Sequence, residues 1–285
     1  FNASNDLLTE KDARLNTTTY DYATSANADY QVGLLKTITD REGGVTTFKY
    51  WTTTSTPTPP ATHVGQLKSV QNPRLKTTSY DYDSAGNLSK ITSPLGFKTT
   101  LSYDSSGRLE TRRDPRGNVP VPPAGYLSQW TYDAVDHVTS FTDARGKVTS
   151  YDYYDNELLW KVTRNDGAPR VTTLEYDSDN RLWTTTDPRN GVETRLYWPD
   201  GQLKSVQSPE GRKASYEYDA AGQLWKLVEP NGNAAGATLA DWTWTYGYDD
   251  AGNRTSEAHP DGGTREIDYD ALNRPFRWTD PLSHV

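Results

Sequence analysis

The chain has 285 residues, a formal net charge of −8 at pH 7, 33% hydrophobic residues and a mean hydropathy of −0.86. It contains no cysteine, which excludes disulfides, thiolate zinc sites and cysteine nucleophiles. A general nucleic-acid binder needs a basic surface, and no cluster of Lys and Arg is present, so we expect no nucleic-acid partner. No apolar run approaches the length of a membrane span.

A repeat of 21 residues runs along the chain, and each unit begins with an aromatic residue at a position that we number 0. The units begin, in chain order, at Phe1, Tyr22, Tyr50, Tyr82, Tyr103, Tyr132, Tyr153, Tyr176, Tyr197, Tyr218, Tyr248 and Tyr269. Longer units need loop insertions, which we place near residues 23–32, 52–64, 119–129 and 233–243. Such a period indicates an array of one supersecondary unit without internal boundaries. We therefore predict a single array over residues 1–285, truncated at both ends.

The first turn of each unit directly follows its aromatic residue, as in Tyr82-Asp83-Ser84-Ala85-Gly86. Asp at position 1 and a residue that tolerates a left-handed backbone at position 4 are typical of a type I turn and its closing residue. We assign structural turn roles to Asp83, Gly86, Asp104, Gly107, Asp219, Gly222, Asp249 and Gly252. We expect positive φ at these glycines and at Gly201, whereas Glu157 fits position 4 poorly.

A second turn comes about ten residues later and is clearest in Asp114-Pro115-Arg116-Gly117. Pro fixes φ at the second position and Gly ends the turn. The turn roles assigned here are those of Asp114, Pro115, Gly117, Pro230 and Gly232. Two turns leave room for two strands in each unit, and the apolar residues at positions 6 and 9 show no sustained helical stripe.

Aromatic residues reach 12% of the chain, with 19 Tyr and 9 Trp, although its overall hydropathy is low. This composition suits a thin sheet that is wetted on much of its surface and stiffened by aromatic ladders. Twenty or more strands in one sheet must curl, because strands twist. The sequence therefore predicts an all-β fold of two-stranded units in one long, curled antiparallel sheet.

No residues stand out as catalytic, cofactor-binding or metal-binding. The histidines, His63, His137, His259 and His284, have no metal-ligand spacing on a common face, and most carboxylates are explained by turns. We therefore predict that the chain is not an enzyme and binds no cofactor. Five tryptophans break the average pattern and are candidates for facing a ligand: Trp51, Trp198, Trp225, Trp242 and Trp244. They could stack against sugars or pair across strands, and both interpretations stay open.

The pattern Y-D-x-x-G-x-L, a spacer and D-P-x-G at a period of 21 resembles the RHS/YD repeat over essentially the whole chain. This family includes bacterial Rhs polymorphic toxins, the C subunits of Tc toxin complexes, wall-associated bacterial proteins and teneurins. The resemblance implies a long β-sheet that spirals into a hollow shell, and in toxin members the shell encloses a C-terminal toxic domain. It also implies a bacterial protein that is secreted or displayed on the cell surface.

The resemblance leads us to expect a structural shell segment that encapsulates or presents a C-terminal effector domain outside this chain. The alternative is an adhesion module on the cell surface that binds carbohydrates or receptors. In toxin members a region after the repeats often cleaves itself by means of aspartates. Asp280-Pro281-Leu282 occupies an ordinary second-turn position, so we assign no cleavage chemistry to it.

Overall fold

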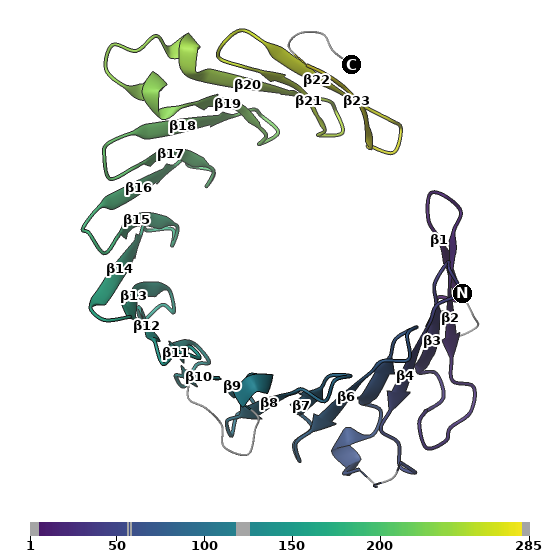
Figure 1. Ribbon diagram of the computed structural model, residues 1–285. Helices are drawn as coiled ribbons and strands as arrows, with labels where there is room; N and C mark the ends of the chain where they lie inside the picture. The colour runs from purple at the N-terminus through teal and green to yellow at the C-terminus, as the bar shows by residue number, and fades with distance from the viewer. Residues whose placement is uncertain (1–5, 56, 58, 118–125, 281–285) are drawn as a thin grey trace. The chain divides into compact units, whose positions relative to one another are not determined.

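The computed structural model describes residues 6–55, 57, 59–117 and 126–280. It divides into two compact units, Phe1–Ser150 and Tyr151–Val285 (Figure 1). Several residues named from the sequence lie outside the described residues: Pro281, Leu282, His284, Val285 and most of the expected insertion at 119–129. The repeat register continues across the boundary in the sequence, and the single array over residues 1–285 stays a prediction.

The described residues form β-strands and four short 3-10 helices. The strands of the first unit are β1 (Thr9–Lys11), β2 (Thr17–Tyr22), β3 (Leu35–Thr39), β4 (Val45–Tyr50), β5 (Leu67–Gln71), β6 (Thr77–Tyr82), β7 (Leu88–Thr92), β8 (Lys98–Tyr103), β9 (Leu109–Arg113), β10 (Leu127–Tyr132), β11 (Val138–Thr142) and β12 (Val148–Tyr153), which ends just past the boundary. Those of the second unit are β13 (Leu159–Asn165), β14 (Pro169–Tyr176), β15 (Leu182–Thr186), β16 (Val192–Tyr197), β17 (Leu203–Gln207), β18 (Lys213–Tyr218), β19 (Leu224–Val228), β20 (Thr243–Tyr248), β21 (Arg254–Ala258), β22 (Thr264–Tyr269) and β23 (Pro275–Thr279). The 3-10 helices are η1 (Ala61–His63), η2 (Pro115–Gly117), η3 (Pro230–Asn233) and η4 (Leu239–Trp242).

Within each unit of the structure, every strand pairs antiparallel with the next strand in the sequence. The pairing runs without interruption from β1 to β12 and from β13 to β23. The strands of each unit follow an arc in Figure 1, as the twist of neighbouring strands requires. The predicted all-β fold of two-stranded repeats is confirmed, and no helix in the described part of the chain is long and apolar enough to cross a membrane.

The two faces of the sheet differ in chemistry, as β6 and β7 illustrate. On one face Tyr80 lies opposite Ile91 and Tyr82 lies opposite Leu88. On the other, Asp81 lies opposite Lys90, with 2.8 Å between the carboxylate oxygen Oδ2 and Nζ. The same polar pair recurs as Asp152–Lys161, Glu217–Lys226 and Asp268–Arg277. We call the two sides the aromatic face and the polar face.

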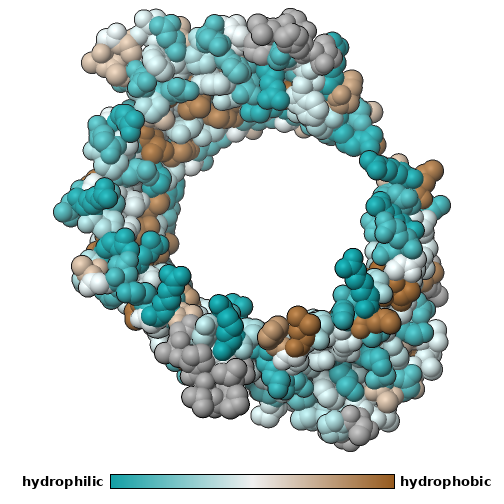
Figure 2. Space-filling model, in the orientation of Figure 1, coloured by the Kyte–Doolittle hydropathy of each residue, from teal (hydrophilic) through white to brown (hydrophobic). Residues whose placement is uncertain are grey.

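The sheet is a single layer with little buried interior. Among the described residues only Ala23, Val228 and Ile267 are buried apolar residues. Figure 2 accordingly shows patches of hydrophobic residues among hydrophilic ones along the sheet. Stability must therefore come from contacts between neighbouring strands, since no second layer covers either face.

A β-bulge lies opposite the repeated tyrosine, in the strand that follows it, where Ser89 of β7 is the extra residue between Leu88 and Lys90. In β6 the register with β7 shifts between Asp81 and Tyr82. The same shift occurs before the position 0 tyrosine in nine further hairpins. A bulge bends its strand and increases the local twist. Because the bulge recurs once per repeat, each repeat bends in the same way.

The hydroxyl group of the repeated tyrosine bonds to the preceding repeat. The Tyr82 hydroxyl donates to the backbone carbonyl oxygen of Leu67 at 2.9 Å, beyond the last paired residues of β5 and β6, Ser69 and Ser79. Equivalent bonds of 2.8–3.2 Å join Tyr22 to Leu7, Tyr50 to Leu35, Tyr103 to Leu88, Tyr132 to Leu109, Tyr176 to Leu159, Tyr197 to Leu182, Tyr248 to Leu224 and Tyr269 to Arg254. Burial raises the pKa of Tyr82, so its hydroxyl remains a protonated donor at neutral pH.

We expect Tyr82→Phe to lower the free energy of unfolding by about 1 kcal/mol, because the carbonyl group of Leu67 loses its donor. Tyr80→Phe is the matched control, since Tyr80 lies on the same face two residues earlier and its hydroxyl has no such bond within the described residues. Chemical denaturation of the two variants measures the difference. Equal losses of stability would show that the hydroxyl bond does not contribute.

Candidate functional site

The repeated aspartate at position 1 caps the first turn. In the Tyr82 repeat, Asp83 Oδ1 accepts the backbone N–H groups of Ala85 and Asn87, each at 2.9 Å. The turn closes with a 3.0 Å bond from the Gly86 N–H to the Asp83 carbonyl oxygen, and Gly86 has φ +94°. Asp104, Asp219 and Asp249 make the same pair of side-chain bonds, and Gly107, Gly201, Gly222 and Gly252 have φ between +79° and +91°.

In several repeats the residue at position 4 is not glycine but still adopts the left-handed conformation. Asn180 and Asn273 have φ of +62° and +57°, which asparagine tolerates at low cost. Glu157 has φ +69° although its longer side chain gains nothing in this region. The poor fit expected from the sequence is therefore accommodated by local strain in an exposed turn.

The glycines of two second turns are needed for space rather than for positive φ. Pro115–Gly117 forms η2, and the Gly117 N–H donates to the Asp114 carbonyl oxygen at 2.9 Å. A Cβ atom on Gly117 would lie 2.6 Å from Cβ of Tyr126. Gly232, in η3 with Pro230, would meet Cβ of Trp242 at 2.6 Å. In both turns the residue directly before the next strand packs against the glycine.

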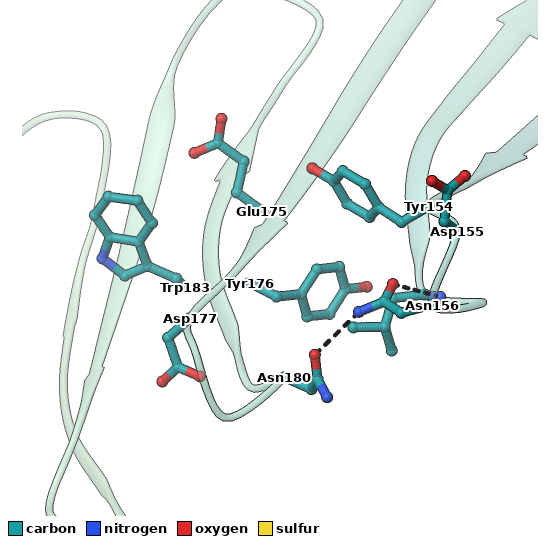
Figure 3. Close-up of a pocket in the computed structure, with 9 residues that line it drawn as sticks. Tyr154, Asp155, Asn156, Glu175, Tyr176, Asp177, Asn180 and Trp183 are labelled. Atoms are coloured by element: carbon teal, nitrogen blue, oxygen red, sulfur yellow. Dashed lines mark hydrogen bonds between the residues drawn. The ribbon is translucent and has the colours of Figure 1, made fainter.

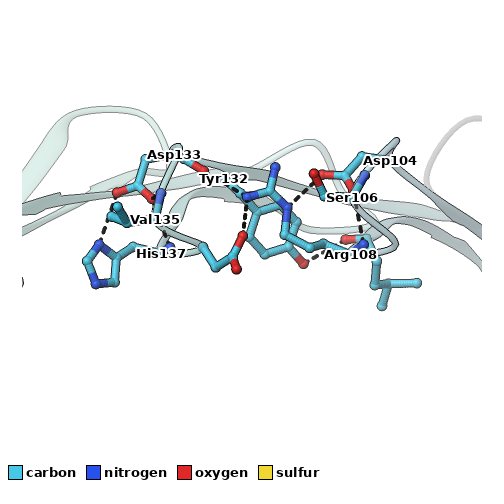
Figure 4. Close-up of polar contacts among 9 residues, drawn as sticks. Asp104, Ser106, Arg108, Tyr132, Asp133, Val135 and His137 are labelled. Atoms are coloured by element: carbon cyan, nitrogen blue, oxygen red, sulfur yellow. Dashed lines mark hydrogen bonds and ion pairs between the residues drawn. The ribbon is translucent and has the colours of Figure 1, made fainter.

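Side chains at position 5 join the first turns of successive repeats into what we call the rim ladder. Arg108 donates through Nε to Asp104 in its own turn at 2.8 Å, and through Nη1 to the Asp133 carbonyl oxygen and to Asp136 Oδ1 in the next turn, each at 2.7 Å (Figure 4). Its guanidinium group also lies 4.7 Å from the ring centroid of Tyr132. Neutral side chains make the same connection from Gln66 to Gly86, from Gln202 to Gly222 and from Asn253 to Asn273. Sequence reasoning missed this ladder.

Three repeats carry an aromatic residue at position 1, in place of aspartate. Trp51 Nε1 donates to the Tyr80 carbonyl oxygen at 3.4 Å, and Trp198 Nε1 donates to that of Tyr216 at 3.1 Å. The hydroxyl group of Tyr154 donates to the Leu174 carbonyl oxygen at 3.2 Å. Each acceptor lies two residues before the next repeat's tyrosine. An aromatic residue at position 1 thus connects to the neighbouring repeat directly.

Trp242 and Trp244, two of the five tryptophans singled out from the sequence, line a hollow beside η3 and η4. The hollow also contains Glu229, Asp241 and His259. Trp244 Nε1 donates to Glu229 Oε1 at 2.7 Å, and its ring lies 4.4 Å from that of His259. These contacts hold the rings of Trp244 and His259 in place, and the hollow offers no nucleophile with an adjacent base.

We call the edge of the sheet that carries the first turns the rim. In the second compact unit, a similar hollow occurs twice on this rim. Each hollow is lined by an aromatic residue at position 1 of one repeat and by a glutamate and a tryptophan of the next repeat. In the first of these hollows, Tyr154, Glu175 and Trp183 surround the ring of Tyr176 (Figure 3). Glu175 Oε2 accepts the hydroxyl of Thr184 at 2.9 Å, while Tyr154 and Tyr176 meet edge to face at 6.2 Å. The side chain of Trp183 is exposed.

The same combination occurs again at the next pair of repeats. Trp198, Glu217 and Trp225 line the second hollow, and Glu217 Oε1 accepts from Lys226 Nζ at 2.9 Å. The structure therefore brings Trp198 and Trp225 together, whereas Trp51 lies in the other unit and Trp242 and Trp244 line a separate hollow. Trp183 was not singled out from the sequence. It could have been found from its position in the repeat, because Trp160, Trp183 and Trp225 all occupy position 7.

The described histidines are dispersed along the sheet. His63 Nε2 lies 2.6 Å from the Asp83 carbonyl oxygen, and His137 Nδ1 lies 3.0 Å from Asp133 Oδ2. Among the described residues no group of three or more His, Asp or Glu is arranged to hold a metal ion. The chemistry offered by the rim is therefore hydrogen bonding, aromatic stacking and negative charge.

The turn aspartates make stability depend on pH. The backbone N–H of Arg108 lowers the pKa of Asp104, burial opposes this effect, and the Arg108 guanidinium group lowers the pKa further. The pKa values of Asp83, Asp143, Asp249 and Asp270 are lowered in the same direction. A carboxyl pKa that is lower in the folded chain stabilises it above the unfolded pKa of about 3.9, and this stabilisation is lost as the pH falls.

We expect Asp104→Asn to lower the midpoint of thermal unfolding at pH 7, and the difference from the unsubstituted chain to shrink as the pH falls below about 3.9 and through the lower pKa of Asp104 in the folded chain. Thermal unfolding followed by circular dichroism from pH 7 to pH 3 measures this. The control is Asp250→Asn, because Asp250 is exposed and accepts no bond within the described residues. A difference in unfolding midpoint between Asp104→Asn and the unsubstituted chain that stays constant with pH would contradict the role of the charged cap.

The model of the RHS Repeat family matches residues 63–98, 82–119, 197–234 and 230–264. The chain is 27% identical over 146 residues to double-stranded DNA deaminase toxin A of Burkholderia cenocepacia (strain H111), which covers 51% of this chain and 9% of that protein. It is 29% identical over 163 residues to toxin protein Tse5 of Pseudomonas aeruginosa, covering 55% and 12%, and 30% identical over 103 residues to tRNA nuclease WapA of Bacillus subtilis (strain 168), covering 35% and 4%. The chain thus spans only about a tenth, or less, of the length of these relatives.

The fold has close counterparts among solved structures. The crystal structure of TcdB2-TccC3-Cdc42 has a TM-score of 0.71 at 16% identity, over 98% of this chain and 16% of that one. The Photorhabdus luminescens Tc holotoxin pore gives the same TM-score and identity over the same shares. These similarities concern the fold, and the family match and the repeat register agree with them. The chain is therefore built from RHS repeats and belongs to the RHS/YD-repeat family.

Proposed function

We propose that this chain is a segment of the structural shell of a longer RHS-repeat protein, and that the shell encapsulates or presents a C-terminal effector domain outside this chain. The observation that carries the proposal is the single-layer sheet, which has solvent-facing side chains on both faces. A sheet without a covering layer separates two wet spaces, as a wall does. The tyrosine bonds and the rim ladder connect its repeats in series, which suits a wall that has to stay continuous.

The relatives support a division of labour between repeats and effector. Their names give a deaminase that acts on double-stranded DNA and a nuclease that acts on tRNA. The described residues of this chain use their aspartates as turn caps and their tyrosines as links between repeats. We infer that the repeats are not an enzyme and that effector chemistry belongs to another segment of the parent protein. We also infer a bacterial protein that is secreted or displayed on the cell surface.

The charge of the chain bears on the kind of effector. Proteins that act on nucleic acids carry basic surfaces, because they must neutralise phosphates. An effector of the kind named in the relatives would therefore be cationic. This chain carries a net charge of −8, so the two parts would attract each other.

The alternative, a carbohydrate- or receptor-binding adhesion module, has less support. Of the five tryptophans named from the sequence, only Trp225 is among the exposed large hydrophobic residues. The indole N–H groups of Trp51, Trp198 and Trp244 are already bonded within the protein. A row of exposed indole rings, which sugar binding would favour, is not formed by these residues.

Limited proteolysis of the full-length parent protein tests the enclosing role. We expect a C-terminal epitope to be cleaved at least about tenfold more slowly in the parent than in the C-terminal segment expressed alone, because a protease must wait for the wall to open. Combining Tyr132→Phe with Tyr248→Phe should shorten the protection, since each change removes a bond between repeats. Cleavage of the epitope at the same rate in the parent and in the separate segment would contradict encapsulation.

A further inference from the structure

The hollow lined by Trp198, Glu217 and Trp225 adjoins a further hollow on the same rim. The first has a volume of about 420 Å³ and the second, which reaches Tyr246, about 700 Å³. Both are lined by Asp219 and Trp225, so the two hollows adjoin along three successive repeats, and we treat them together as one groove. We define the rim groove by Trp198, Trp225, Tyr246, Asp200, Asp219 and Asp250.

The rim groove carries three carboxylates that no salt bridge neutralises within the described residues. No Lys or Arg lines either hollow. Of its carboxylates, Glu217 is paired with Lys226 at 2.9 Å, whereas Asp200, Asp219 and Asp250 have no ion pair within the described residues. The oxygens of Asp200 and Asp219 accept only N–H groups of their own turns. The groove is therefore complementary to a cation.

The rim ladder explains why the charge accumulates here. In three other repeats position 5 is an arginine that pairs with the cap, as Asp104–Arg108, Asp177–Arg181 and Asp270–Arg274. In the three repeats that form the groove this position is neutral, with Gln202, Gln223 and Asn253. Two of them keep a bond to the next repeat, since Gln202 donates to Gly222 at 2.7 Å and Asn253 donates to Asn273 at 3.0 Å. The wall thus keeps its connection and the groove keeps its charge.

The aromatic residues of the groove are suited to the same ligand. Trp225 is 40% exposed, and a guanidinium or ammonium group is attracted to the face of such a ring. The protein already uses this contact on the rings of the groove: Lys204 Nζ lies 4.2 Å from the ring centroid of Trp198, Lys226 Nζ lies 5.7 Å from that of Trp225, and Arg254 lies 5.3 Å from that of Tyr246. A neutral sugar would stack on the rings, but it would leave the carboxylates without a counter-charge.

We propose that the rim groove binds an extended polypeptide segment rich in arginine or lysine, whose cations lie between the aromatic rings and the carboxylates. That this segment belongs to the enclosed effector rests on the proposed function. Equivalent strands of successive repeats lie two strand spacings, about 10 Å, apart, so basic residues at about every third position of an extended chain would match the repeats. The distance between successive repeats then sets the spacing of the basic residues along the bound segment.

Fluorescence anisotropy with the 285-residue chain and a labelled peptide of about four Arg-Ser-Gly repeats tests the proposal. We expect saturable binding that weakens between about 50 and 300 mM salt, because the charges are partly exposed. Combining Trp225→Ala with Asp250→Asn should weaken binding by about tenfold. The single variant Asp250→Asn, on an exposed side chain, should weaken it by about twofold to threefold and keeps the test open if the double variant unfolds.

The control is the pair Glu10→Gln and Glu42→Gln, which removes two exposed carboxylates from the other unit. The control should bind the peptide as the unsubstituted chain does. An equal loss in the control, or no binding of the peptide, would overturn the proposal. Saturable binding of a neutral oligosaccharide that Trp225→Ala abolishes would overturn it in favour of the adhesion function. Encapsulation is judged separately by protease protection of the parent, so failure of the peptide experiment leaves that result unaffected.

Discussion

The bond from the repeated tyrosine hydroxyl to the carbonyl group of the preceding repeat is the contact on which the sheet depends most. A single-layer sheet has no core whose burial could hold distant parts together, and each strand is held only by its neighbours. The position 0 tyrosine lies at the end of its strand, where the ladder between repeats has already stopped. It lies opposite an aliphatic residue of its own repeat, and its hydroxyl donates to a carbonyl group of the preceding repeat. One side chain thus contributes apolar contact within a repeat and polar contact between repeats.

The local features of the fold could be predicted from the sequence because they depend on residues close together in the chain. Asp83 and Gly86 belong to one turn, and the turn chemistry alone indicates the cap and the left-handed closing residue. The bulge opposite Tyr82 and the bonds from Arg108 to the next turn could not be predicted in this way. The Arg108 bonds join residues 25 and 28 positions apart, and the bulge depends on how two strands pair rather than on the residues of one turn. A register written from sequence gives equivalent positions, but it does not show which of them touch.

The candidate site shows the same division. Trp198 and Trp225 stood out because they break the repeat pattern, and the structure brings them to one hollow. Trp51 and Trp244 stood out for the same reason, yet their indole N–H groups are bonded within the protein. A departure from the consensus therefore marks a position where the wall does something different, without saying whether the difference serves packing or a ligand. Exposure and hydrogen-bond partners decide between the two, and both are properties of the folded chain.

The rim groove illustrates how a repeat array gains a specific surface without losing its wall. The tyrosine bond, the bulge and the cap define the backbone, so they constrain positions 0, 1 and 4 most strongly. Position 5 has a looser constraint, because arginine, glutamine and asparagine all reach the next turn. The exchange of arginine for glutamine there changes the local charge by one unit and keeps the connecting bond. Three such neutral positions in succession are enough to make an acidic groove, so the charge of the rim can vary from repeat to repeat while the sheet beneath it stays the same.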